Sequence, residues 1–280
     1  MPFAIRPNRF TWNVNSSVAS GTYGVSVIPG ASNVEGGWTS IITGANLTND
    51  VCEVVLYVAN GNSSGASKEH LIDIGIDPAG GTSYTAIVSN LAVGESGGGA
   101  DGGRRFRFPV RIPAGSQIAV RVQGANATAG TVRVAIQCFG LPSNPEAIRV
   151  GSFSETIGTI TNSSGVSFIP GNAADGTWAL LGVTTNELWW WQIGGQCDNA
   201  ALAAVGTQTV DLAYGDATNK TIIIEDFFLV SQGTEIIHNT HAQNCYCEVP
   251  AGSNIYIRSR AHTAPDTGWN AVAVGIGGDA

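Results

Sequence analysis

Lysine is almost missing from this sequence, which has only Lys68 and Lys220 among its 280 residues. Charged residues of all kinds make up 12%, against about 25% in an ordinary globular protein. Because solvent-facing helices are usually covered by charged and polar side chains, this composition disfavours an α-rich fold. The net charge of −8 also argues against nonspecific binding to nucleic acid, which needs Lys and Arg to neutralise phosphates.

Long apolar runs are missing as well. No segment approaches the roughly 20 residues of a membrane span, and residues 1–7 lack the apolar core of a secretory signal. We therefore expect a soluble protein made in a cytoplasm, with no membrane partner. The five cysteines are an odd number and are scattered, which fits thiols in a reducing compartment better than a disulfide framework.

The most informative feature that is present is an internal repeat. The same three blocks occur twice in the same order: Gly24–Gly30, Trp38 and Ile112–Arg121 in the first half, and Gly165–Gly171, Trp178 and Val249–Arg258 in the second. The period of about 140 residues is that of a compact domain and is much longer than a solenoid repeat. The sequence therefore predicts a duplicated domain, and each copy serves as a control for the other.

Apolar residues alternate with polar ones in short runs that Gly, Pro, Asn and Ser interrupt, which is typical of strands. Phe106, Phe108, Val110 and Ile112 share one face of such a run. The fold class is expected to be all-β, with two tandem β-sandwich, jelly-roll-like domains from an internal duplication. An up-and-down barrel is the alternative.

The repeat sets the expected boundaries of the parts. These are an N-terminal arm or first strand at 1–20, a first β-sandwich at 21–141, a linker at 142–150 and a second β-sandwich at 151–280. We expect each half to close around its own apolar interior.

Charge is divided unevenly between the halves. Residues 1–150 hold 10 Lys+Arg against 9 Asp+Glu, which gives +1, and residues 151–280 hold 3 against 12, which gives −9. This asymmetry favours head-to-tail contact between unlike halves of neighbouring molecules, and hence a homo-oligomer.

The densest aromatic run is Leu188–Trp191. Alignment of the copies places Trp190 on Glu53, whose charge marks the outward face, so Trp190 is expected to be exposed and Trp189 and Trp191 to lie in the core. An exposed tryptophan stacks on a sugar ring or buries itself in a neighbouring subunit. The alternative is an isolated tryptophan under a loop.

Arg105, Arg107 and Arg111 follow the same strand at a spacing that puts them on its outer side. They are candidates to bind an acidic glycan or the carboxylates of another subunit. The alternative is a solvated sheet face whose arginines have local Asp and Glu partners.

The His238–Cys247 segment contains two histidines and two cysteines, but the repeat argues against a metal site. Cys245 and Cys247 align with Phe108 and Val110, which face inward, and a buried cysteine behaves as a small apolar residue. Cys52 and Cys138 are expected to be buried too, and Cys197 to lie in a loop. No metal or cofactor is expected.

Catalysis has no support in the sequence. No carboxylate pair, triad or metal-binding set recurs in both copies, and the acidic neighbours that exist cannot be placed across a cleft. We therefore expect the protein not to be an enzyme.

The segments Leu71–Ile76, Asn90–Ala92 and Phe108–Ser116 together resemble a recurring block in virion proteins of tailed bacteriophages. The second half shares this block more weakly, at Val210–Leu212 and Pro250–Ser253. The resemblance implies a β-sandwich component of a phage particle.

The first expected function is accordingly a non-enzymatic structural component of a tailed-phage virion, in a tail or baseplate appendage or as a decoration of the capsid surface. Its expected partners are other virion proteins and further copies of the chain, with no nucleic acid. The alternative is a carbohydrate-binding, lectin-like module that recognises a host-surface glycan.

Overall fold

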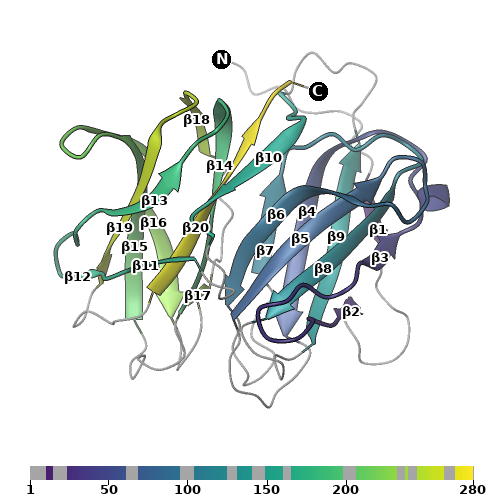
Figure 1. Cartoon of the computed structure of the whole chain (residues 1–280), viewed down its shortest axis with the longest axis horizontal. Helices are drawn as coiled ribbons and strands as arrows, with labels where there is room; N and C mark the ends of the chain where they lie inside the picture. The colour runs from purple at the N-terminus through teal and green to yellow at the C-terminus, as the bar shows by residue number, and fades with distance from the viewer. Residues whose placement is uncertain are drawn as a thin grey trace.

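The structure is a computed structural model that describes residues 11–14, 24–60, 69–94, 104–124, 131–140, 149–159, 165–197, 206–231, 237–238, 245–261 and 269–279. In these ranges the regular structure consists of β-strands and one short 3-10 helix, η1 (Gly44–Asn46). The prediction of an all-β protein is confirmed (Figure 1).

The first half contains nine strands in two sheets. They are β1 (Thr11–Val14), β2 (Val25–Val27), β3 (Thr39–Ile42), β4 (Val51–Asn60), β5 (Glu69–Asp77), β6 (Thr85–Gly94), β7 (Arg104–Phe108), β8 (Gln117–Gly124) and β9 (Val132–Gly140). One sheet has the order β2-β9-β4-β7, with β1 also paired to β9, and the other has the order β3-β8-β5-β6.

The second half repeats this arrangement. Its strands are β10 (Phe153–Ile157), β11 (Val166–Phe168), β12 (Gly171–Asn172), β13 (Ala179–Val183), β14 (Leu188–Cys197), β15 (Gly206–Gly215), β16 (Lys220–Ser231), β17 (Ile237–His238), β18 (Cys245–Val249), β19 (Asn254–Ala261) and β20 (Trp269–Gly277). One sheet has the order β11-β20-β14-β18, with β10 also paired to β20, and the other has β13-β19-β15-β16.

The two strand orders are identical once the strands of each half are matched in sequence. In both halves the last strand lies inside its sheet, β9 between β2 and β4 and β20 between β11 and β14, so it pairs with strands that are far from it in the chain. This is the order of a jelly roll and excludes an up-and-down barrel. The prediction of two tandem jelly-roll-like β-sandwiches is therefore confirmed.

The alternation that predicted the strands is seen directly in β9. Val132, Val134, Ile136 and Cys138 are buried, and the residues between them are partly exposed. Successive side chains of a strand point to opposite faces of a sheet, so one face of β9 lies in the core and the other faces outward.

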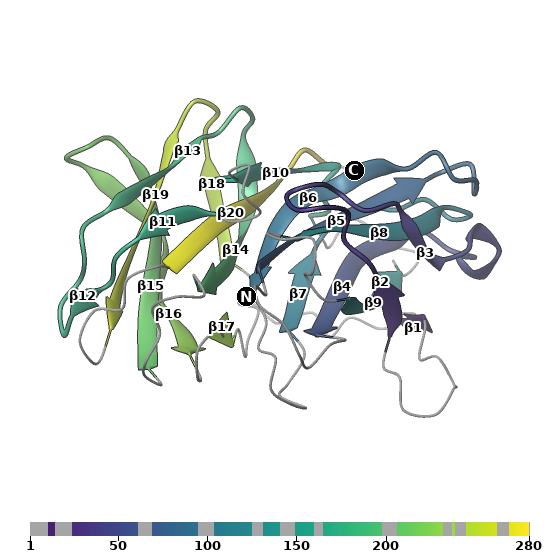
Figure 2. The ribbon, with the colours of Figure 1, turned by 60° about the horizontal axis from the view of Figure 1, so that its bottom comes forward.

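The two halves lie side by side and are joined through a common sheet (Figures 1 and 2). β14 of the second half runs parallel to β6 of the first, with Gly195 paired to Val93, and this contact makes one sheet of nine strands. Ser154 of β10 also donates a hydrogen bond to the carbonyl of Ile87 at 2.6 Å, and Thr156 donates one to the carbonyl of Ser89.

The apolar core of the first half extends into the second. In the first half, β6 and β7 end their sheets on the same side of the sandwich, and five residues of β14 and β20 complete the core there: Trp189, Trp190, Val272, Val274 and Ile276. The second half has a separate core, which includes Trp191, Leu212, Ile257 and Ala273. The prediction that each half closes around its own interior is therefore wrong for the first half, because the opening between β6 and β7 is filled by its neighbour.

All nine residues of β20 are buried, which follows from its position between these two cores. Val272, Val274 and Ile276 face the first half, and Ala271 and Ala273 face the second. A strand that is covered on both faces is apolar throughout rather than alternating.

The described part of the N-terminal segment belongs to the first sandwich. Thr11–Val14 pairs antiparallel with β9, so these four residues form a strand of that sheet. The other residues of 1–20, and residues 142–148 of the expected linker, lie outside the described residues, and the N-terminal arm remains a prediction.

Candidate functional site

Trp190 lies at the junction of the halves and is 1% exposed. The β14 register shifts between Leu188 and Trp190, and this bulge turns Trp189 and Trp190 toward the first half while Trp191 enters the second core. β4 has the same shift between Val51 and Glu53. The alignment of the copies is thus supported, but the prediction that Trp190 is exposed is wrong, because the first half covers that face.

The surroundings of Trp190 are those of a packing residue. Its ring lies 6.0 Å from that of Phe108, centroid to centroid, and the side-chain carbonyl of Gln192 accepts a hydrogen bond from the backbone N–H of Arg107 at 3.4 Å. Trp190 therefore joins the two halves and offers no surface to a ligand in this conformation.

The three candidate arginines do not form one binding patch. Arg107 pairs with Glu53 at 2.5 Å, and Arg111 pairs with Asp50 at 2.9 Å. Arg105 is exposed, with its guanidinium 5.8 Å from the ring of Tyr57. The alternative interpretation, local carboxylate partners on a sheet face, describes Arg107 and Arg111.

The Asp50 carboxylate has a second hydrogen-bond donor besides Arg111. The backbone N–H of Ala114 donates to its carboxylate at 2.9 Å, as does Arg111. These bonds, first that of Ala114 and then that of Arg111, hold the pKa of Asp50 below its usual value.

The cysteines face as the repeat predicts. Cys52 and Cys138 are buried, and burial raises the pKa of Cys138 to about 12. Cys245 and Cys247 are partly buried against the second core. Cys197 is the last residue of β14, so the prediction that it lies in a loop is wrong.

A charged cluster that the sequence analysis missed crosses the outer face of the first half. Asp73 of β5 is buried and accepts hydrogen bonds from Arg121 of β8 at 2.7 and 2.8 Å. Arg121 also pairs with Glu35 at 2.5 Å, and its guanidinium stacks on Trp38, 4.5 Å from the ring centroid. We call these four residues the first clamp.

The second half contains the same cluster at the matching positions. Asp211 of β15 accepts from Arg258 of β19 at 2.8 Å, and Arg258 also pairs with Asp175 at 2.9 Å. The Arg258 guanidinium lies 4.4 Å from the ring centroid of Trp178. We call these four residues the second clamp.

Each buried aspartate also holds a turn of backbone. Asp73 accepts from the N–H of Asn90 at 2.6 Å, and Asp211 accepts from the N–H of Asp226 at 2.8 Å. Asn90 and Asp226 have φ values of 54° and 48°, a conformation that non-glycine residues adopt rarely. A strained bulge is therefore fixed in both halves by the same buried carboxylate.

The clamps are chemically occupied. A Cβ on Gly75 would lie 2.6 Å from the Trp38 ring, so Trp38 has Gly75 on one side and Arg121 over its ring. Partial burial raises the pKa of Glu35, as does the Asp73 carboxylate, while Arg121 opposes them. The side chains that could grip a sugar or a reacting group are thus engaged with one another, and the cluster fixes the segment before Trp38 to the sheet.

The expectation that no carboxylate pair recurs in both copies is wrong. Each clamp has an acidic residue three positions before its tryptophan, Glu35 before Trp38 and Asp175 before Trp178. The arginines follow the repeated Pro-Ala-Gly-Ser turn at equal distances. Comparison of charged positions between the copies, rather than of turns and apolar residues alone, would have found the set.

The outer faces of the two halves differ next to the clamps. In the second half a row of paired residues crosses four strands. Leu180 and Ile222 at its ends are 49% and 38% exposed, and the partly exposed Tyr256 and the buried Ala213 lie between them. The matching row of the first half is Ser40, Ala119, Gly75 and Ala86. We call the first set the apolar row, and it has no counterpart of similar size in the first half.

The part of the chain that the structure describes is residues 11–279 with the gaps given above. Within them no three His, Cys, Asp or Glu side chains are grouped to hold a metal ion. None of the described helical segments is long and apolar enough to cross a membrane.

The fold defines a double jelly-roll protein. No protein-family model matches the chain, and no curated protein matches it. Among solved structures, PNGF-II is similar with a TM-score of 0.34 and 10% identity over 97% of this chain and 65% of that chain. The tandem CBM22-1–CBM22-2 domain of Paenibacillus barcinonensis Xyn10C has a TM-score of 0.27 and 11% identity, over 97% and 92%. PNGase F from Flavobacterium meningosepticum, a glycosylasparaginase, has a TM-score of 0.31 and 9% identity over 96% of this chain and 96% of that chain. Likenesses this loose transfer neither an activity nor a ligand to this chain.

Proposed function

We propose that this chain is a non-enzymatic structural component of a tailed-phage virion that acts through contacts with neighbouring particle proteins. The observation that carries the proposal is the apolar row on the outer sheet of the second half. The sequence blocks that resemble phage virion proteins support the same assignment, and in the fold these blocks supply the strands, turns and part of the first clamp.

The apolar row has the properties of a contact surface. Leu180, Tyr256, Ala213 and Ile222 are paired across adjacent strands, which are spaced about 4.8 Å apart. Leu180 and Ile222 are exposed at the two ends of the row, Tyr256 is partly exposed with Lys220 over its ring, and Ala213 is buried. Exposed apolar side chains at both ends of one row, with a partly exposed tyrosine between them, support the proposal that this face is a contact surface.

The net charge of the second half indicates the chemistry of the partner. Asp175 and Asp226 beside the row are already paired with Arg258 and Arg260, but the second half carries −9 overall. The partner that fits is a protein surface with an apolar centre and a Lys/Arg rim, contributed by another particle protein.

The junction supports a structural role because it holds the two halves firmly together. A shared sheet, a shared core and backbone hydrogen bonds such as Gly151 N–H to the carbonyl of Pro109 at 2.8 Å connect the halves. Such a junction is tighter than the small polar contact that allows domains to move.

The test is the double variant Leu180→Ser, Ile222→Ser, compared with Ile28→Ser, Val34→Ser, which removes two exposed apolar residues from the first half. Particles assembled with each variant as the sole source of the chain are purified and the content of the chain is measured. We expect a large loss with the first variant and normal content with the second.

Equal incorporation of both variants would overturn the role of the apolar row, and absence of the wild-type chain from particles would overturn the virion assignment. Sedimentation of the purified wild-type chain separately measures self-association. Self-association that the first variant abolishes would identify the partner as a second copy, in place of a different particle protein.

Glycan recognition is the second candidate function, and a specific observation favours it. Tyr246 of β18 is 59% exposed, and an exposed aromatic ring next to polar side chains is a common feature of sugar-binding sites.

A further inference from the structure

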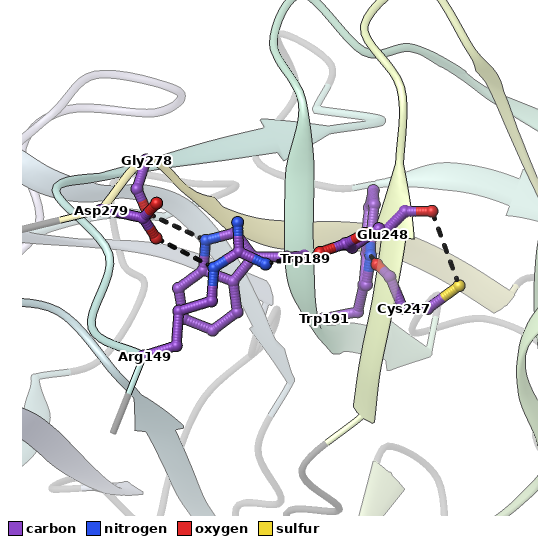
Figure 3. Close-up of polar contacts among 7 residues, drawn as sticks. All are labelled: Arg149, Trp189, Trp191, Cys247, Glu248, Gly278 and Asp279. Carbon is purple, nitrogen blue, oxygen red and sulfur yellow. Dashed lines mark hydrogen bonds and ion pairs between the residues drawn. The ribbon is translucent and has the colours of Figure 1, made fainter. Parts of the chain in front are cut away.

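A group of aromatic and charged side chains meets at the junction, where β18, the segment before β10 and the end of the chain come together. Tyr246 and Glu248 point outward from β18, Arg149 comes from the segment that enters the second half, and Asp279 follows β20. These parts are distant in the sequence and are brought together by the fold (Figure 3).

Tyr246 is supported by a buried tryptophan. Its ring is nearly parallel to that of Trp189, with an interplanar angle of 6° and a centroid distance of 6.1 Å. Trp189 is 1% exposed, and its indole N–H donates to the carbonyl of Gly278 at 2.9 Å. The exposed ring therefore rests on a fixed base, which lowers the entropy that a ligand would lose in ordering it.

Arg149 holds the two carboxylates in place. Its guanidinium lies over Trp189, 4.7 Å from the ring centroid, and donates to Glu248 at 2.8 Å and to Asp279 at 2.9 Å (Figure 3). The side chains of Glu248 and Asp279 are 73% and 77% exposed, so solvent and ligands reach both carboxylates.

We infer that Tyr246, Glu248, Asp279 and Arg149 form a subsite for one neutral or amino sugar residue of a surface glycan. The apolar face of the sugar ring would stack on Tyr246, and its hydroxyl or ammonium groups would donate to the carboxylates, which only accept hydrogen bonds. One arginine against two carboxylates leaves the group with a charge of −1, which disfavours uronic acids and sulfated sugars. This inference rests on glycan recognition as a function and is independent of the apolar row.

The first half offers a built-in comparison. In the alignment of the copies, Tyr246 corresponds to Pro109, Glu248 to Arg111 and Trp189 to Cys52. The aromatic ring, its base and the carboxylate are thus all specific to the second half, as expected for a site that arose after duplication.

Isothermal titration with three probes tests the inference: maltohexaose as the neutral sugar, a chitosan hexamer as the amino sugar and an oligogalacturonate as the acidic one. We expect the wild-type chain to bind the neutral or the amino probe more tightly than the acidic one. Tyr246→Ala should weaken that binding about tenfold, since a stacked aromatic contact contributes up to about 1.5 kcal/mol.

Matched variants separate the site from general effects. Tyr246→Phe keeps the ring and should bind like the wild type, Glu248→Gln should bind more weakly, and Ile222→Ser, on the other sheet, should not change binding. Thermal unfolding of each variant checks that the fold is kept. Binding that persists in Tyr246→Ala, or that is tightest for the acidic probe, would overturn the site, and no binding of any probe would overturn glycan recognition itself.

Discussion

The edge strands β7 and β18 occupy the same place in the two halves but are covered very differently. Phe106 and Phe108 of β7 are 1% and 0% exposed, whereas Cys245 and Cys247 of β18 are only partly buried. The open side of the first sandwich is filled by β14 and β20 of the second, and among the described residues no third sandwich fills the side next to β18. The two copies of a duplicated fold therefore become asymmetric once strands of one copy cover the open side of the other.

The junction depends on a few polar-to-apolar differences between the copies. In the aligned strands, Glu53 of the first half corresponds to Trp190, and Gln137 corresponds to Val274. These differences turn an outward sheet face into a second apolar face, and burial of that face contributes on the order of 25 cal/mol for each Å² of apolar surface.

The largest effect is expected from Trp190→Ala. Loss of this ring removes packing between the halves as well as part of the first core, at a cost of about 3–5 kcal/mol in the free energy of unfolding. Calorimetry should show two separate transitions, because the halves no longer unfold together. Trp191→Ala, which lies in the second core, is the matched control and should destabilise without uncoupling the halves. A single transition at the wild-type temperature in Trp190→Ala would show that the junction does not couple them.

A smaller effect, equal in both halves, is expected from Asp73→Asn and Asp211→Asn. Each substitution weakens a hydrogen bond between a buried charge and a partly exposed arginine, which costs about 2 kcal/mol. Urea unfolding measures the loss, and Asp279→Asn, which affects an exposed ion pair, should change stability by less than about 1 kcal/mol. If only one of the buried substitutions destabilised the protein, the two clamps would not be equivalent.

The smallest effect concerns thiol access and leaves stability unchanged. In a Cys197→Ser background, iodoacetamide should label Cys245 and Cys247 in the folded protein, and Cys52 and Cys138 only after unfolding. Burial raises the pKa of Cys245 and Cys247 and so slows their alkylation. Both side chains are nevertheless partly exposed, so the reagent reaches them. Mass spectrometry of the labelled peptides reads the result. Protection of all four thiols would mean that something covers the second half as fully as β14 and β20 cover the first.

Much of the fold was predictable because its signals are local. Alternation in Val132–Cys138 marked the inward face of a strand, and the alignment of Cys245 with Phe108 gave the correct inward direction for a residue type that also binds metals. Strand order could not be derived from the sequence, because most hydrogen bonds between neighbouring strands of a sheet join residues that are far apart in the sequence.

The candidate site was predicted less well, for a related reason. Trp190 was placed on the correct side of its strand. Whether that side is in contact with water depends on the neighbouring domain, which covers it and leaves Trp190 only 1% exposed. Arg107 and Arg111 were recognised as outward residues, and their carboxylate partners became identifiable only when β4 and the turn before it were placed beside β7.

By itself the amino-acid sequence determined the strands, the duplication and the direction of most side chains, because pleat geometry and turn chemistry act over a few residues. The tertiary structure decided which outward faces stay exposed, which charges are neutralised, and that Arg149, Glu248 and Asp279 meet at Trp189. Those properties depend on which distant segments pack together, and packing is a property of the whole chain rather than of any segment.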